Sequence, residues 1–133
     1  MIKKIMVVDD DPDIALSVKR GLEGLGEDFE VTCVSSGIDC IETLKNNQAP
    51  DLILLDIMMP GMSGWELQNR LRENSDWGKI PIVFLTAKTD PFSKTFGKTI
   101  GMDYVEKPFE IEDLGRRIKD ILKKINSKYP GFE

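Results

Sequence analysis

Residues 52–61 of the chain read LILLDIMMPG, four apolar residues that run into one carboxylate, Asp56, and then a Pro-Gly turn. A short continuous apolar run bounded by turn residues is typical of a strand buried on both faces of a parallel sheet. A carboxylate at the end of such a strand loses its hydration unless a cation or a hydrogen-bond donor holds it. The stretch therefore predicts a central strand with a polar site at its end.

Length and composition restrict the classes of protein that fit the chain. It has 133 residues, a formal net charge of −5 and no histidine. The length fits one domain, and the missing histidine excludes histidine bases and histidine-ligated zinc. The acidic balance argues against nucleic-acid binding by this domain. Cys33 and Cys40 lack C-x-x-C spacing, so we interpret both as small core or near-core residues in a reducing compartment.

The N-terminus predicts a first strand. Residues 1–8 combine a charged start with a short apolar run, and aspartates follow without a small-residue cleavage site. No apolar run approaches the length of a membrane span. We therefore expect a cytoplasmic protein that does not engage a membrane.

Apolar runs and helical patterns alternate along the chain. The predicted strands are residues 3–9, 29–33, 51–56, 81–85 and 102–106. The predicted helices cover about 12–25 and 110–126, and others begin at Ser36-Gly37, Ser63 and Asp90-Pro91. The helix after Ser36-Gly37 is predicted to carry Ile38, Ile41 and Leu44 on its inner, buried face.

This alternation predicts an α/β fold with a five-stranded parallel sheet and helices on both faces. The first, third and fourth strands are near-continuous apolar runs, as central strands are, whereas the second and fifth alternate like edge strands. We therefore predict the strand order 2-1-3-4-5, a flavodoxin-like arrangement.

Polar residues end four of the predicted strands. They are Asp9-Asp10, Asp56, Thr86 and Lys107. The carboxyl ends of parallel strands share one edge of the sheet, and ligands bind there where the strand order reverses. Three adjacent carboxylates repel one another unless they hold a hard divalent cation such as Mg²⁺. The set suits phosphoryl transfer to Asp56, with Thr86 and Lys107 contacting phosphoryl oxygens.

Four motifs resemble the receiver domain of two-component response regulators, the CheY-like family. They are VVDDD at 7–11, LLDIMMPG at 54–61, LTA at 85–87 and YVEKPF at 104–109. The resemblance implies that Asp56 is the phosphoacceptor. It also implies that Mg²⁺ (or Mn²⁺) is bound by Asp10, Asp56 and the backbone carbonyl of Met58, with Asp9 acting mostly through a metal-bound water.

The resemblance further assigns a switch. Thr86 is expected to shift toward the phosphoryl group while Tyr104 turns inward, and Ala87 leaves access to the site. The family also implies a cis peptide bond between Lys107 and Pro108.

The resulting interpretation is one receiver domain at residues 1–126, with a tail or the start of a linker at 127–133. The resemblance implies a phosphorylation-dependent switch that receives a phosphoryl group from a sensor histidine kinase. It is not a turnover enzyme, although it catalyses its own phosphorylation and a slow autodephosphorylation. Its helix at 90–100, fifth strand and last helix would signal to an unknown effector, and a homodimer could form there.

Two alternatives remain open. Asp9-x-Asp11 is shared with haloacid-dehalogenase-like metal-dependent phosphohydrolases, although Asp13 stands where that family has Thr or Val. A pseudo-receiver that binds partners without phosphorylation is the other. No G-x-x-x-x-G-K-[ST] or G-x-G-x-x-G motif occurs, so nothing indicates a nucleotide cofactor.

Overall fold

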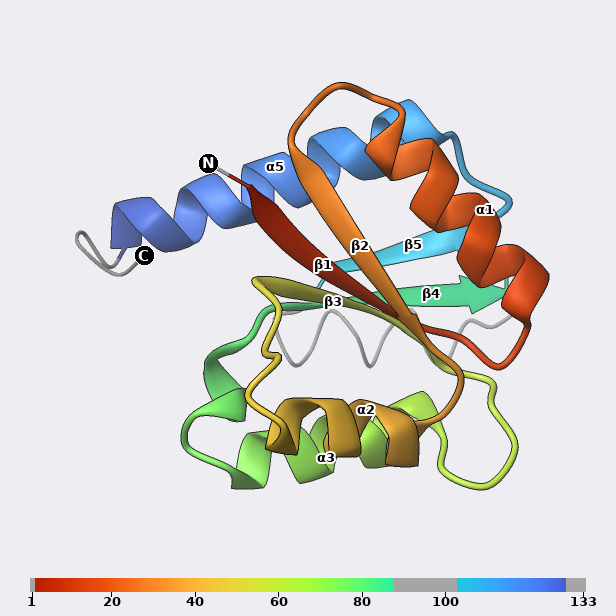
Figure 1. Cartoon of the computed structure of the whole chain (residues 1–133), viewed down its shortest axis with the longest axis vertical. Helices are drawn as coiled ribbons and strands as arrows, with labels where there is room; N and C mark the ends of the chain where they lie inside the picture. Colours follow the sequence, from red (N-terminus) through yellow and green to blue (C-terminus); the bar gives the residue numbers. More distant parts are fainter. Residues whose placement is uncertain (1, 88–102, 129–133) are drawn as a thin grey trace.

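A computed structural model describes residues 2–87 and 103–128 of the chain. Within these ranges the chain forms a five-stranded, all-parallel sheet in the order β2-β1-β3-β4-β5, which confirms the predicted topology (Figure 1). The predicted helix at 90–100, with Phe92 and Phe96, lies outside the described residues, as does the end of the predicted tail, 129–133.

The elements follow the predicted pattern closely. The strands are β1 (Lys3–Val8), β2 (Phe29–Val34), β3 (Leu52–Asp56), β4 (Ile82–Ala87) and β5 (Asp103–Lys107). The helices are α1 (Pro12–Glu23), α2 (Gly37–Lys45), α3 (Gly64–Glu73) and α5 (Ile111–Lys128), with a short 3-10 helix, η1 (Trp77–Lys79), that was not predicted. The helix predicted over 12–25 ends at Glu23: the N–H of Leu25 bonds to the carbonyl of Leu22 in a tighter turn, and Gly26 then adopts a positive φ of 75°.

Two hydrophobic layers cover the sheet. In Figure 1, α1 and α5 lie on one face and α2 and α3 on the other. Ile5 and Val7 of β1 point into the α1/α5 layer, and Met6 and Val8 point into the α2/α3 layer. Every residue of β3 is buried, as its apolar run predicted. Each fully buried aliphatic side chain contributes about 1.5–3 kcal/mol, so β3 is a main anchor of the fold.

Two predictions about core positions were wrong. The buried residues of α2 are Gly37, Cys40 and Leu44, whereas Ile38 is 65% exposed and Ile41 is partly buried. Residues i and i+4 share a helix face, so burying Cys40 with Leu44 turns Ile38 toward solvent. Cys33 is exposed because it lies on the edge strand β2, while Cys40 is buried as predicted.

Local signals at the loop ends of the helices are confirmed. The side chain of Asp11 accepts the N–H groups of Asp13 and Ile14 at 3.0 and 3.4 Å, so α1 begins directly after the Asp9-Asp10 pair. Ser63 accepts the N–H of Glu66 at 3.2 Å and fixes the start of α3. The Lys107–Pro108 peptide bond is cis, as the family resemblance implied.

Within the described ranges, none of the helices combines the length and apolar character needed to span a membrane.

Candidate functional site

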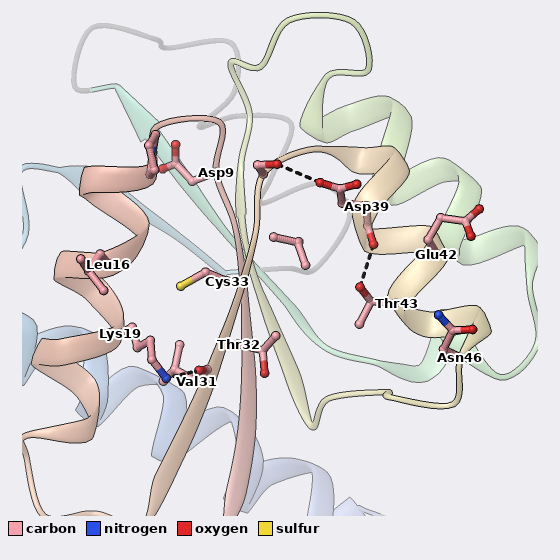
Figure 2. A pocket seen from close by; sticks show the side chains of 13 residues that line it. Asp9, Leu16, Lys19, Val31, Thr32, Cys33, Asp39, Glu42, Thr43 and Asn46 are labelled. Carbon is pink, nitrogen blue, oxygen red and sulfur yellow. Dashed lines mark hydrogen bonds between the residues drawn. The ribbon is translucent and has the colours of Figure 1, made fainter.

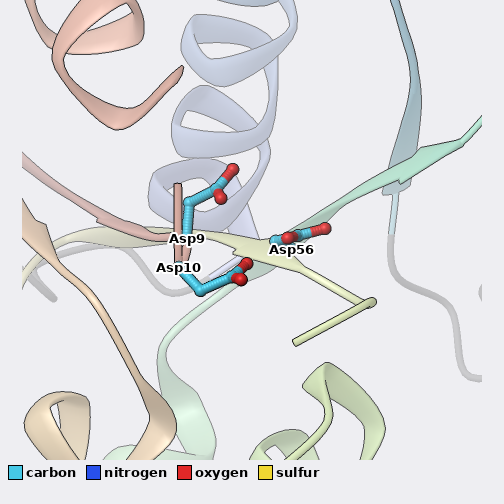
Figure 3. A group of neighbouring side chains, drawn as sticks. All are labelled: Asp9, Asp10 and Asp56. Carbon is cyan, nitrogen blue, oxygen red and sulfur yellow. The ribbon is translucent and has the colours of Figure 1, made fainter. Parts of the chain in front are cut away.

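Three carboxylates meet at the carboxyl edge of the sheet, where the strand order reverses between β1 and β3. One oxygen from each of Asp9, Asp10 and Asp56 lies within 4.8 Å of the other two, and Figure 3 shows the side chains gathered at the strand ends. Asp9 follows β1 directly and donates its backbone N–H to the carbonyl of Val34 at 3.1 Å. Asp56 is the last residue of β3. The sheet topology thus brings together the carboxylates that the strand ends predicted.

Burial makes this cluster energetically unfavourable on its own. Asp9 and Asp56 are 1% and 6% exposed, whereas Asp10 is exposed. Burial raises the pKa of Asp56, the Lys107 ammonium opposes this increase, and the charges of Asp9 and Asp10 add to it. Asp56 also accepts the N–H of Met58 at 3.4 Å, a contact that favours its ionised form. The net effect is an anionic centre with more negative charge than its own residues neutralise.

Lys107 is the cation of the site among the residues that the structure describes. It ends β5, and its Nζ lies 3.4 Å from Oδ2 of Asp9 and 3.6 Å from Oδ1 of Asp56. Both distances exceed the roughly 2.7–2.9 Å of a tight charge-assisted hydrogen bond. The Lys107 ammonium therefore lies between two carboxylates without a tight hydrogen bond to either one. A further anion placed beside it could attract this ammonium.

Thr86 and Tyr104 lie on the two strands beyond β3. Thr86 is 2% exposed and follows Leu85, the residue of β4 that pairs with Asp56. Tyr104 pairs with Phe84 and is partly buried against the α2/α3 layer. The strands therefore carry Thr86 toward the edge that holds the carboxylates, and they place Tyr104 two residues further back in the sheet.

The predicted contribution of Met58 through its backbone agrees with the position of its side chain, which is 70% exposed. Its N–H group points to Asp56, and the role of its carbonyl stays a prediction. The side chain of Ala87 lies outside the described part of the chain.

Gly64 was not predicted as a site residue. A Cβ atom at this position would lie 2.6 Å from the carbonyl oxygen of Asp56 and 2.8 Å from Cα of Ile57. The N–H of Gly64 also donates to the carbonyl of Ile57 at 3.0 Å. The first turn of α3 therefore packs against the backbone that holds Asp56. The Ser63-Gly64 pair could have indicated this, since a glycine beside a capping residue permits a close backbone approach.

The donor set fits a hard divalent cation. Asp9, Asp10 and Asp56 offer only carboxylate oxygens, and the exposure of Asp10 leaves one side of the cluster open to water. Mg²⁺ prefers a few carboxylate oxygens and retains several water ligands, whereas soft metals select thiolates. The cluster is therefore suited to Mg²⁺ or Mn²⁺.

Comparisons with known proteins agree with the site. A family model described as the response regulator receiver domain matches residues 5–119. The phosphate regulon transcriptional regulatory protein PhoB of Rhizobium meliloti is 38% identical over 125 residues, which cover 93% of this chain and 54% of that protein. The chain thus spans about half the length of the curated relatives it matches.

Solved structures give the same result. A response regulator receiver domain protein (CheY-like) from Methanospirillum hungatei superposes with a TM-score of 0.78 at 36% identity, covering 93% of this chain and 97% of that one. The chemotaxis protein CheY4 of Vibrio cholerae gives a TM-score of 0.77 at 31% identity, with coverages of 91% and 99%. The chain belongs to the response regulator receiver domain family. This membership places it among the phosphorylation-dependent switches of two-component systems, which are generally not turnover enzymes.

Proposed function

We propose that Asp56 is the phosphoacceptor of this receiver domain and that a sensor histidine kinase is the donor. A carboxylate oxygen of Asp56 attacks the phosphorus of a phosphohistidine, the N–P bond breaks, and the released imidazole takes up a proton. The observation that carries the proposal is the convergence of Asp9, Asp10 and Asp56 within 4.8 Å, with the Lys107 ammonium shared between two of them.

The surrounding residues supply positioning and charge. Asp10, Asp56 and the carbonyl of Met58 would hold Mg²⁺ or Mn²⁺, with Asp9 acting through a metal-bound water. When bound, the cation supplies neutralisation of negative charge on the transferring group. Lys107 moves from its shared position onto a phosphoryl oxygen. Such positioning also supports a slow autodephosphorylation, in which water attacks the acyl phosphate and Asp56 is restored.

The switch and the partner surface follow from the same residues. Phosphorylation adds charge that Thr86 and Lys107 can bind, and Tyr104 turns inward as Thr86 shifts. Between α5 and β5, Nη1 of Arg117 lies 3.4 Å from Oδ1 of Asp103 and 3.4 Å from the carbonyl of Tyr104. These bonds link β5 to α5, which supports a joint surface of β5 and α5 for an effector or a homodimer. The third part of the predicted surface, residues 90–100, lies outside the described residues.

We propose that residues 1–126 form the receiver unit and that 127–133 form a tail or the start of a linker. The relatives are about twice as long as the matched region, and the effector protein or domain is unknown. This domain itself is proposed to bind neither nucleic acid nor membrane, and to act in the cytoplasm.

Intact-mass measurement with acetyl phosphate and Mg²⁺ tests the proposal. The wild type should gain one phosphoryl group, and Asp56→Asn or addition of EDTA should prevent this. Asp76→Asn is a matched control, because it removes an exposed carboxylate that makes no capping hydrogen bond. Lack of an adduct on the wild type would favour the pseudo-receiver. Multiple turnover of small phosphoesters would favour the phosphohydrolase.

A further inference from the structure

The sheet has an outer edge at β2, which pairs with β1 alone among the described residues. The carbonyls of Asp28 and Val34 accept N–H groups from Lys3 and Asp9, so alternate residues of this segment face β1. The residues between them, which include Val31 and Cys33, therefore turn their N–H and C=O groups outward. An edge of this kind is a template for pairing with another extended chain.

Two side chains of α1 occupy the outward groups at the centre of this edge. Oε2 of Glu23 accepts the N–H of Val31 at 2.9 Å, and Nζ of Lys19 donates to the carbonyl of Val31 at 2.7 Å. Nζ of Lys19 also lies 3.0 Å from Oε2 of Glu23. Figure 2 shows the Lys19 side chain reaching from α1 to Val31. The pair thus takes the place that a neighbouring strand would have at Val31.

The remainder of the edge is accessible. A groove of about 810 Å³ runs between α1 and α2 beside β2 and is lined in part by Leu16, Cys33, Ser35 and Asp39 (Figure 2). Cys33 and Ser35 are exposed, so the carboxyl half of the edge has room for another chain. The Lys19–Glu23 pair is what interrupts the edge at its centre.

The energetics agree with a blocking role. Lys19 and Glu23 are 37% and 34% exposed, and exposed ion pairs at i and i+4 contribute little to stability by themselves. The hydrogen bond from Val31 and the contact with Lys19 lower the pKa of Glu23, which favours the charged form that makes both contacts.

We propose that the Lys19–Glu23 pair keeps β2 from pairing edge to edge with β2 of a second copy of this chain. The sequence of β2 suits such pairing once the pair is removed. In an antiparallel two-fold arrangement centred on Val31, Glu30 stands opposite Thr32 of the second copy, so no like charges oppose each other directly. Phe29 stands opposite Cys33 in the same register.

The test compares two double variants of the unphosphorylated protein. Lys19→Ala/Glu23→Ala removes the pair without changing the net charge, and alanine is a strong helix former, so α1 is retained. Glu27→Ala/Lys119→Ala is the matched control, because it removes another Lys–Glu pair at 3.0 Å that does not touch β2. The readouts are sedimentation at increasing protein concentration and hydrogen exchange of the Val31 amide.

Three results are expected. The first double variant should form a dimer at concentrations where the wild type and the control stay monomeric. In dilute solution its Val31 amide should exchange about tenfold faster than in the wild type, a change typical of losing one hydrogen bond. Adding Cys33→Pro should abolish the dimer, because proline removes an outward N–H from the edge.

Other results would overturn the proposal. A folded Lys19→Ala/Glu23→Ala variant that stays monomeric at all concentrations is one, and a dimer that survives Cys33→Pro is another. If the double variant does not fold, Glu23→Ala alone frees the N–H of Val31, so its dimer formation and the exchange of its Val31 amide are judged by the same criteria.

Discussion

Replacing Asp56 with asparagine should stabilise the protein when no divalent cation is present. The change keeps the size of the side chain and an oxygen that can accept the N–H of Met58. It removes a 6% exposed charge that lies within 4.8 Å of two other carboxylates. The expected sign is therefore the opposite of the usual loss of stability after a substitution in a buried site.

The magnitude follows from the distances. At an effective dielectric constant of about 20, two carboxylates 4.8 Å apart repel by about 3–4 kcal/mol. The Lys107 ammonium at 3.6 Å contributes an attraction of about 4–5 kcal/mol, which fully offsets the repulsion from Asp9. The burial of Asp56 and the repulsion from the exposed Asp10 remain, and together they amount to about 2 kcal/mol. Asp56→Asn should thus raise the melting temperature by about 5–10 °C.

The pH dependence gives a second test of the same reasoning. Because the pKa of Asp56 is raised in the folded state, the folded protein binds more protons than the unfolded chain in the window above about pH 4. Stability of the wild type therefore falls as the pH rises through that window. The advantage of Asp56→Asn should be absent at lower pH and fully developed above the window.

The assay is urea or thermal unfolding of both proteins in EDTA, followed by circular dichroism. Asp76→Asn controls for net charge and should shift the melting temperature little, since its carboxylate is exposed. Added Mg²⁺ should stabilise the wild type more than Asp56→Asn, by mass action. The reasoning fails if Asp56→Asn in EDTA at neutral pH is no more stable than the wild type.

Three further changes have defined outcomes. Gly64→Ala should destabilise the fold by about 2 kcal/mol or more in urea unfolding, because its Cβ would lie 2.6 Å from a backbone oxygen; an unchanged midpoint would contradict the packing. Gln68→Leu should stabilise it by about 1–2 kcal/mol in the same assay, because Nε2 of this 2% exposed residue has no hydrogen-bond partner in the described part of the chain; a loss of stability would show that the amide is satisfied. Burial raises the pKa of the Cys40 thiol to about 12, and it also raises the pKa of the exposed Cys33 thiol. A thiol reagent at mildly alkaline pH should therefore modify Cys33 slowly and Cys40 only after unfolding. Prompt reaction of both thiols in the folded protein would refute this.

The strand order of the sheet could be predicted because a strand buried on both faces is apolar throughout, whereas an edge strand alternates apolar and polar residues. The strand at 52–56 is apolar without interruption, and β2 alternates as an edge strand does, so the strand order followed from these contrasts. The strand order in turn predicted that Asp9, Asp56 and Lys107 lie at one edge of the sheet.

The rotation of a short helix was harder to predict. In the nine-residue α2, the apolar pattern allowed a face centred on Ile38 as well as one centred on Cys40. In the structure the buried face carries Gly37, Cys40 and Leu44, and a Cβ at Gly37 would lie 2.5 Å from Sδ of Met62. This contact is long-range, and spacing along the chain does not encode it.

The finer geometry of the site depends on similar contacts. The shared position of the Lys107 ammonium results from the relative placement of three strands, and motif matching specifies only that a lysine is present. The close approach of Gly64 to Asp56 depends on where α3 begins against the sheet. Sequence patterns thus identified the chemical groups, and packing determined the distances between them.

The ion pair between Lys107 and Asp9 joins residues 98 positions apart, and this separation has a consequence for the protein during its synthesis. A ribosome adds residues from the N-terminus, so Asp9, Asp10 and Asp56 leave the exit tunnel well before Lys107. A nascent chain that has already paired β1 with β3 therefore carries the full acidic cluster while its own neutralising ammonium has not yet been made. At that stage the ammonium that lies beside these carboxylates in the folded protein is missing, so cations from the surrounding solution can help to balance the three charges.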